Sequence, residues 1–352
     1  MATHPSVAYC RVPGSGRIAL ASLGDGPPLI LLPGWFTHLH ERWSHPCAAA
    51  ARARLVRAHR LVWYDRLGCG LSDRRRFPHS LRGDVDQLLA VMDSLGIERA
   101  HLLAHCAGTP AATTFAALYP ERVDRLVCCS GFARGGVAVT PDWVEAFRHL
   151  IRTHWELATR TLATLVIPNG SAGDLAWFSD FQQMTTTPEA ARQLLDHLLA
   201  LDACATLPSV RAPTLVVHDR DDPIIPLAAG KELAALIPGA RLHIQEGRGH
   251  DLLIRPSSTL VDVILAFLAR RPFNGDATER KTQEHLTRRE KEILRLIAEG
   301  DSNKSIARVL GIAPGTVERH VTNIYGKMAV RGRAEAATRA VQLGLTGYGH
   351  PH

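Results

Sequence analysis

A single thiol, Cys106, lies among small residues in the segment Ala104-His105-Cys106-Ala107-Gly108. An apolar run ends just before this segment, and an alanine-rich, helix-like run begins just after it. A nucleophile at such a strand–turn–helix corner needs small neighbours, because the corner is strained and the helix must approach closely. The pentapeptide is an imperfect version of G-x-S-x-G and predicts a thiol nucleophile. A buried, unreactive cysteine would give the same pattern.

Two later segments contain side chains that could activate this thiol. The sequences DRDDPIIP (219–226) and GRGHDLL (247–253) each follow an apolar, strand-like run. We predict that His250 takes the thiol proton and that Asp222 holds the imidazole in the required tautomer. The chain order is then nucleophile, acid and base.

Each of these assignments has a structural alternative. Asp219 and Asp221 are close rivals for the role of the acid. Asp222 also suits a turn before Pro223, since aspartate is common in turns. His250 could serve only to cap its loop.

The elements expected to position these residues alternate between strands and helices. Helical runs such as SLRGDVDQLLAVMDSLG (80–96) separate the strand-like runs, and STLVDVILAFLARR (258–271) closes the series. Continuously apolar strands that alternate with helices predict a parallel sheet covered on both faces. The expected strands lie within residues 27–35, 60–68, 99–106, 123–131, 212–219 and 240–247.

Between about residues 136 and 205 this alternation is interrupted by helix formers and aromatic residues. We interpret this stretch as an inserted helical cap above a ligand pocket. The residues expected to line that pocket are Phe36, His105, Trp143, Phe147, Trp155, Trp177 and Phe178.

With these motifs in place, residues 7–270 resemble the α/β-hydrolase family. LLPGWFTH resembles its oxyanion-hole loop, and YDRLGCGLSD resembles its D-x-R-G-x-G-x-S stretch. The family usually has glycine where Ala104 stands and serine where Cys106 stands. A cysteine there favours reactive acyl substrates such as lactones or activated esters.

The resemblance also implies roles for the loops around the thiol. Backbone N–H groups of Trp35 and Ala107 would form the oxyanion hole, where one donor contributes about 3 kcal/mol in comparable enzymes. Trp35 could instead only pack against the cap. Asp65 and Arg66 are expected to brace the loop that carries them rather than to catalyse.

The overall composition bounds the class of protein. The chain has 352 residues, 46% apolar and 21% charged, as in globular proteins, and no apolar run of membrane-spanning length. Seven cysteines without regular spacing favour reduced thiols over a disulfide framework, and we expect no structural zinc. The N-terminal residues do not resemble a signal peptide, so we expect a cytoplasmic protein. No motif in the sequence points to a cofactor, and we expect none.

Most of the excess positive charge lies near the C-terminus. Residues 280–352 contain 13 Lys/Arg against 7 Asp/Glu, a net +6 of the total +7. An anionic partner is therefore expected at this end.

Residues 286–345 predict four short helices. Thr287 and Glu290 are spaced as a capping box, Gly311 ends the second helix, and Pro314 opens the third. Val317, Val321, Ile324 and Met328 form a core stripe on the third helix, beside a polar, basic line. That line suits a DNA major groove, although a solvated bundle face would look alike.

This segment closely resembles a LuxR-type helix-turn-helix domain, with matches at LTRRE, NKSIA, TVERHV, IYGKM and RAEA. The resemblance implies binding to double-stranded DNA and a fourth helix, 333–345, that pairs two copies as a homodimer. Ala313 replaces the usual serine cap of the third helix, and Glu318 replaces a common basic residue. The expected DNA-binding residues are Lys304, Thr316, Arg319, His320, Asn323 and Lys327.

Together, these features predict an α/β-hydrolase fold with a helical cap (residues 1–271), a linker (272–285) and an all-α helix-turn-helix domain (286–352). The expected function is a transcriptional regulator whose hydrolase-like domain senses a small apolar ligand. The alternatives are an active cysteine-dependent ester or lactone hydrolase with an appended DNA-binding domain, and an interaction protein with an inactive pocket.

Overall fold

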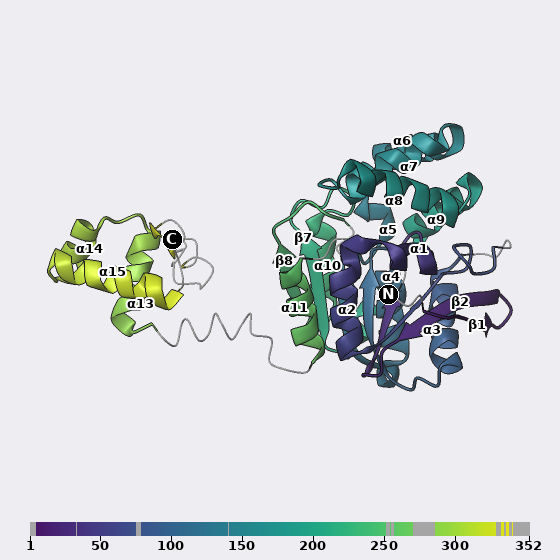
Figure 1. The fold of residues 1–352 in the computed structure, drawn as a ribbon. Coiled ribbons are helices and arrows are strands. Elements are labelled where there is room, and N and C mark those ends of the chain that lie inside the picture. Colours follow the sequence, from purple (N-terminus) through teal and green to yellow (C-terminus); the bar gives the residue numbers. More distant parts are fainter. Residues whose placement is uncertain are drawn as a thin grey trace. The chain divides into compact units, whose positions relative to one another are not determined.

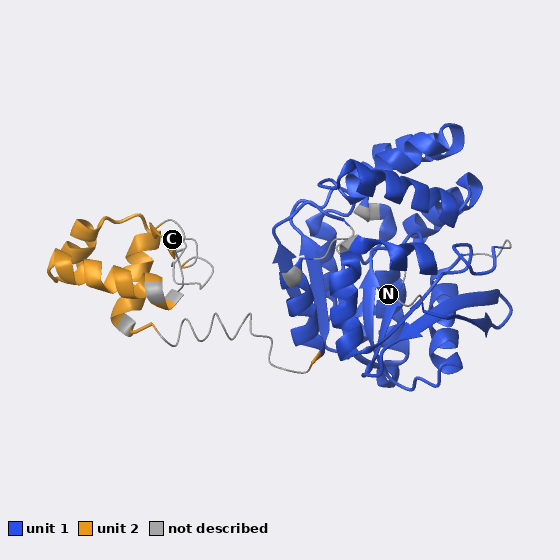
Figure 2. Ribbon diagram, viewed as in Figure 1, with its two compact units in different colours: residues 1–268 blue, residues 269–352 orange. Residues whose placement is uncertain are grey.

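The computed structural model describes residues 5–32, 34–74, 79–139, 141–250, 254, 257–269 and 286–328, with residues 332, 333, 336, 337 and 340. The chain divides into two compact units, residues 1–268 and residues 269–352 (Figure 2). The expected linker, 272–285, lies outside the described residues. Each unit is considered by itself.

The first unit is built on one eight-stranded sheet with the order β1-β2-β4-β3-β5-β6-β7-β8 (Figure 1). From β4 to β8 neighbouring strands are parallel, whereas β1 and β2 form an antiparallel hairpin and β2 also pairs antiparallel with β4. The strands are β1 (Val7–Val12), β2 (Gly16–Leu23), β3 (Pro28–Leu32), β4 (Arg60–Tyr64), β5 (Ala100–His105), β6 (Val123–Cys129), β7 (Thr214–Asp219) and β8 (Arg241–Gln245).

All six strands predicted from the sequence are present and parallel to one another. The sheet is nevertheless mixed rather than wholly parallel, because β1 and β2 form an antiparallel hairpin. The sequence pattern did not predict this hairpin. Along β2 the burial alternates poorly, with Ile18, Ala19, Leu20 and Ala21 all buried. Alanine and glycine have a low strand propensity and the burial does not alternate, so the sequence of β2 does not indicate a strand.

Helices cover both faces of the sheet. On one face α3, α4 and α10 pack into the main apolar core, and on the other α2 packs beside α11. The predicted helices at 80–96 and 258–271 are confirmed as α3 and α11. The helices outside the cap are α1 (Leu39–Ser44), α2 (Ala49–Ala58), α3 (Leu81–Ser94), α4 (Gly108–Leu118), α10 (Leu227–Leu236) and α11 (Ser258–Leu268).

The chain between β6 and β7 forms a helical cap at one end of the sheet (Figure 1), as the sequence predicts. Its own apolar cluster is rich in aromatic residues and is separate from the main core. The cap therefore has a core that it shares with the loop after β3. The cap helices are α5 (Gly135–Ala138), α6 (Pro141–Thr153), α7 (Trp155–Val166), α8 (Ala172–Thr185) and α9 (Pro188–Ala200).

The second unit contains α13 (Arg288–Ala298), α14 (Asn303–Leu310) and α15 (Pro314–Met328). The predicted capping box of Thr287 and Glu290 is present, and Gly311 ends α14 in the left-handed conformation. The predicted core stripe on α15 is buried as far as Ile324, whereas the side chain of Met328 lies outside the described residues. The same holds for most of the expected fourth helix, 333–345, of which Ala336 and Ala340 are buried.

In the described part of the chain, no helix is both long and apolar enough to cross a membrane.

Candidate functional site

Cys106 lies on the sharp turn between β5 and α4. Its backbone adopts φ 47°, a left-handed conformation that is costly for a residue with a side chain. Three hydrogen bonds hold the turn. Cys106 N donates to the Cys129 carbonyl at 3.0 Å, and Thr109 donates to the Cys106 carbonyl through its N at 3.0 Å and its Oγ1 at 2.7 Å. The structure thus has the strained nucleophile corner that the small residues predict.

His250 follows β8 and points its Nδ1 at the carboxylate of Asp222, with distances of 2.9 and 3.1 Å to the two oxygens. The thiol of Cys106 also hydrogen-bonds the His250 side chain. Asp222 is itself fixed by backbone N–H groups of Ile224 and Ile225, at 2.9 and 3.0 Å from its Oδ1. The three side chains predicted from the sequence therefore converge, in a buried environment.

The charges in this group favour an imidazolium between two acceptors. Burial opposes protonation of His250, but Asp222 and Cys106 outweigh it and raise the pKa of the imidazole well above its usual range. Burial likewise opposes ionisation of Asp222, yet His250 and the two backbone donors lower the pKa of its carboxyl. A protonated imidazole beside the sulfur stabilises negative charge on it, as a thiol nucleophile requires.

The rival acids have other positions. Asp219 accepts hydrogen bonds from Gly249 N at 2.8 Å and from Gln245 Nε2 at 3.0 Å, so it ties the loop of His250 to β7. Burial raises the pKa of Asp219 to about 6. Asp221 is exposed. Of the three candidates, only Asp222 contacts the imidazole of His250.

The backbone N–H groups of Trp35 and Ala107 are the two expected to form an oxyanion hole. Neither Trp35 N–H nor Ala107 N–H donates a hydrogen bond to another described residue. Ala107 is the N-cap of α4, so its N–H group belongs to the positive end of that helix. Both groups are thus available to a ligand oxygen next to the thiol.

A cavity opens above Cys106, and we call it the cap cavity. Four of the predicted pocket residues line it: Phe36, His105, Trp143 and Phe178. Its lining is mostly apolar, as in many small-molecule sites, with Arg42, His105 and His250 as its charged or titratable side chains beside Cys106. The sequence reading missed the aliphatic part of this lining, which consists of Val139, Leu162, Val166, Leu195, Leu198, Ile224 and Ile225.

Three predicted pocket residues lie elsewhere. Phe147 stacks on Trp143 with ring centroids 4.9 Å apart and does not line the cavity. The rings of Trp155 and Phe36 pack edge to face, with their centroids 6.4 Å apart. Trp177 lies against the ring of His45 and lines a different cavity. Aromatic residues of a cap build its own core as well as a pocket, and sequence alone does not separate the two uses.

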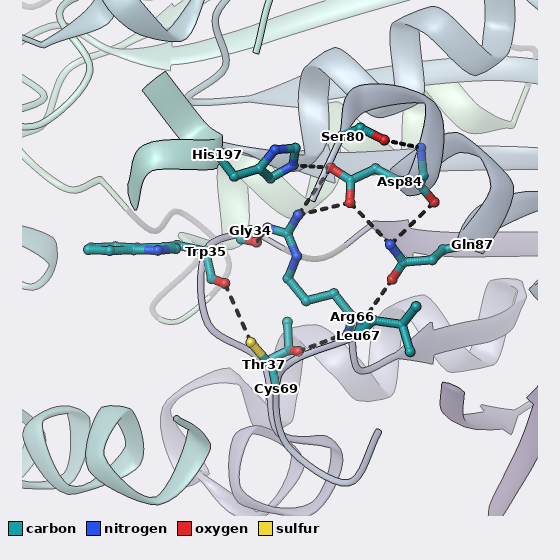
Figure 3. Close-up of polar contacts among 11 residues, drawn as sticks. Gly34, Trp35, Thr37, Arg66, Leu67, Cys69, Ser80, Asp84, Gln87 and His197 are labelled. Atoms are coloured by element: carbon teal, nitrogen blue, oxygen red, sulfur yellow. Dashed lines mark hydrogen bonds and ion pairs between the residues drawn. The ribbon is translucent and has the colours of Figure 1, made fainter. Parts of the chain in front are cut away.

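A buried polar network holds the loop of Trp35 (Figure 3). Arg66 donates to the Gly34 carbonyl at 3.2 Å and forms an ion pair with both oxygens of Asp84 at 3.0 Å. His197 of the cap helix α9 reaches the same carboxylate at 2.7 Å. Arg66 thus braces the loop, as expected, and Asp84 links it to the cap.

Asp84 was not singled out from the sequence. The sequence feature that could have identified Asp84 is its position on the apolar face of a predicted helix. Leu88 and Val91 follow it at helical spacing, and both are fully buried. Burial opposes its ionisation, but Arg66 and then His197 lower the pKa of Asp84.

Replacing Asp84 with asparagine should lower the free energy of unfolding of the first unit by about 3 kcal/mol, because Arg66 is left buried and unpaired. Urea unfolding at pH 7 measures this. Because the pKa of Asp84 is lower in the folded than in the unfolded protein, its ionised carboxylate stabilises the folded state at pH values above the unfolded pKa, about 4. This stabilisation is lost as the pH falls through the folded-state pKa. The difference in the free energy of unfolding between the parent and the Asp84→Asn protein should therefore be smaller at pH 3 than at pH 7. Asp86→Asn, on the same helix but more exposed, is the matched control, and an equal loss there would contradict the account.

In the second unit the predicted DNA-binding residues lie on α14 and α15. Lys304, Thr316, Arg319 and Asn323 are exposed, and His320 is partly exposed. Val317, Val321 and Ile324 face the opposite way, into the core. The polar line predicted on the third helix is therefore on its outer side.

Lys327 is placed differently from the expectation. Its Nζ lies 2.7 and 2.8 Å from the two carboxylate oxygens of Glu290, whose side chain is only 3% exposed. The ammonium group of Lys327 neutralises a buried carboxylate within the unit. This partner, far apart in sequence, could not be read from the pattern on α15.

Lys327→Met should therefore destabilise the second unit, by about 1–2 kcal/mol, because Glu290 loses its charged partner. Hydrogen–deuterium exchange of α13 in the full chain is the measurement, and faster exchange is expected. Lys304→Met removes an exposed charge and should leave this exchange unchanged. Equal protection in the two variants would mean that the ion pair carries no stability.

Comparison with known proteins agrees with both halves of this description. Residues 27–255 match the alpha/beta hydrolase fold family, and residues 284–340 match the bacterial regulatory proteins of the luxR family. The chain belongs to the alpha/beta hydrolase fold family and carries a LuxR-family helix-turn-helix domain on its C-terminal side.

Individual relatives resemble the first unit. A 2-hydroxy-6-oxo-6-phenylhexa-2,4-dienoate hydrolase of Burkholderia cepacia is 28% identical over 273 residues, 72% of this chain and 91% of the relative. A 2-hydroxy-6-oxononadienedioate/2-hydroxy-6-oxononatrienedioate hydrolase of Klebsiella pneumoniae is 29% identical, with the same two coverages. The solved enol-lactonase of Burkholderia xenovorans LB400 is 25% identical with a TM-score of 0.62, over 75% of this chain and all of that one.

Proposed function

We propose that this protein is a DNA-binding transcriptional regulator whose hydrolase-fold unit binds a small apolar ligand at Cys106. The observation that carries the proposal is the convergence of Cys106, His250 and Asp222 at an apolar cap cavity, in a chain with a LuxR-family domain. Two-fold operators favour a homodimer, and we propose that the protein acts as one in the cytoplasm.

The chemistry proposed for the ligand follows from the groups around the sulfur. The Cys106 sulfur attacks an acyl carbon, and the resulting oxyanion receives hydrogen bonds from Trp35 N–H and Ala107 N–H. His250 gives its proton to the departing alkoxide, which leaves an acyl thioester on Cys106 and an alcohol. The ligand is therefore an apolar ester or lactone.

A second candidate, an active hydrolase, shares this first step and needs only a water to cleave the thioester. The ordered His250–Asp222 pair favours it, since a base that activates a thiol can also activate water. The relatives compared above are named as hydrolases and as a lactonase, which supports an acyl substrate in either case. The two candidate functions differ in one respect. In the regulator, binding of the ligand changes DNA binding, whereas in the hydrolase, cleavage of the ligand is itself the function.

The proposal is tested with the full-length protein and a random pool of DNA duplexes. Selection should enrich one sequence, and the affinity for it should change several-fold with at least one member of a panel of apolar esters and lactones. The Cys106→Ala protein should keep the DNA affinity and lose or alter this response. A DNA affinity that no ester or lactone shifts, with no small molecule co-purifying by mass spectrometry, would remove the sensor function.

A further inference from the structure

A second cavity, larger than the cap cavity, adjoins it, and we call it the helix cavity. Gly34, Arg42 and His105 line both cavities. Gly34 and His105 lie in close contact, since a Cβ atom on Gly34 would be 2.9 Å from His105 Nδ1. Neither Cys106 nor His250 lines the helix cavity. It is therefore a site apart from the reactive thiol.

The helix cavity lies between the sheet and the helices α2 and α11. Its inner walls are apolar and buried: Leu55 of α2, Val261 and Ile264 of α11, and Leu103 of β5. Apolar, buried walls suit the hydrocarbon body of a ligand.

Arg52, a half-buried residue of α2, adds a positive charge to the lining of the helix cavity. The guanidinium of Arg52 donates to the His45 carbonyl at 2.8 Å and lies over the ring of Trp43, and no described carboxylate pairs with it. Burial and then the charge of Arg42 lower the pKa of Arg52. The positive charge of Arg42 thus acts on Arg52, and an anionic group at Arg52 would be favoured at this apolar cavity.

The one carboxylate among the described residues of the lining is Asp65, which is 1% exposed. Its Oδ2 accepts backbone hydrogen bonds from Leu39 and Leu71, and burial raises its pKa to about 6. Against the charges of Arg42 and Arg52, the lining remains net positive. The cavity thus has an apolar body and a cationic edge.

We propose that the helix cavity binds an amphipathic carboxylate, such as a medium-chain fatty acid, with its head group at Arg52 and its chain along Leu55 and Ile264. This site is independent of the reaction proposed at Cys106.

The experiment uses the full-length protein and two fluorescent probes of nearly the same shape. One, 1-anilinonaphthalene-8-sulfonate, is anionic, and the other, N-phenyl-1-naphthylamine, lacks the sulfonate. Decanoate should displace the anionic probe. Arg52→Met should weaken the anionic probe about tenfold and leave the neutral one within twofold, because only the charge-assisted contact is lost. Arg57→Met, an exposed arginine of the same helix, should change neither.

Two substitutions locate the probe. Ala51→Phe fills the helix cavity and should abolish decanoate-sensitive binding, whereas Val139→Phe fills the cap cavity and should leave it intact. The proposal is overturned if decanoate displaces no probe from the parent, or if Val139→Phe alone removes the binding. It is also overturned if Arg52→Met weakens both probes equally. Thermal unfolding checks that each variant folds, and Arg52→Met decides the case if Ala51→Phe does not.

Discussion

Replacing His250 with alanine should slow the alkylation of Cys106 by iodoacetamide roughly a thousandfold at pH 7, since a positioned base contributes 10²–10⁴-fold. In the parent, the imidazole hydrogen-bonds the thiol and carries a positive charge fixed by Asp222. Without it, the sulfur loses the charged partner that would stabilise an anion in this buried environment, where an unpaired charge is costly. Peptide mass spectrometry over time measures the rate at this one cysteine.

The neighbouring carboxylates supply matched controls for this result. Asp222→Asn should slow the same alkylation at least tenfold, because the imidazole loses the charge that holds it protonated. Asp221→Asn changes an exposed side chain one position away and should have no effect. A rate that falls equally in both variants would point to a general disturbance of the loop rather than to the triad.

Reversing two charges on the second unit should nearly abolish DNA binding. The double variant Lys304→Glu with Arg319→Glu should lower the affinity for a generic duplex by roughly a thousandfold at low salt, because backbone phosphates supply most of that affinity. Both side chains are exposed, on α14 and on the outer side of α15. Fluorescence anisotropy at several salt concentrations measures the affinity and should show a shallower salt dependence.

The control carries the same change in charge on the other unit. Arg211→Glu with Lys231→Glu alters two exposed residues of the hydrolase-fold unit and should leave the affinity within about threefold. If both double variants lose affinity alike, net charge rather than the face of α15 governs DNA binding.

Much of the fold could be predicted because its signals are local. Most of the parallel strands are buried apolar runs, although β8 is only partly buried. Cys106 directly follows β5, and Asp222 and His250 lie within a few residues of the ends of β7 and β8. Since the carboxyl ends of parallel strands meet at one edge of the sheet, the three side chains had to lie near one another. The capping box at Thr287 is equally local, with both partners within one helical turn.

What could not be predicted depends on contacts between distant segments. Lys327 belongs by spacing to the polar line of α15, but its partner Glu290 lies on another helix. Phe147 and Phe178 look alike in sequence, yet only the packing of α6 against its neighbours decides which one reaches the cap cavity. The helix cavity has no sequence signal, because it is formed by what the side chains of α2 and α11 leave unfilled.

The most direct test of the reaction at Cys106 is the release of p-nitrophenol when the full-length protein meets p-nitrophenyl butyrate. We expect a rapid burst of about one equivalent per chain, with a butyryl group found on Cys106 by mass spectrometry. Slow or fast release after the burst distinguishes a sensor from a hydrolase. Release from the parent that is no faster than from the Cys106→Ala protein, with no acylated cysteine, would contradict the proposed role of this thiol.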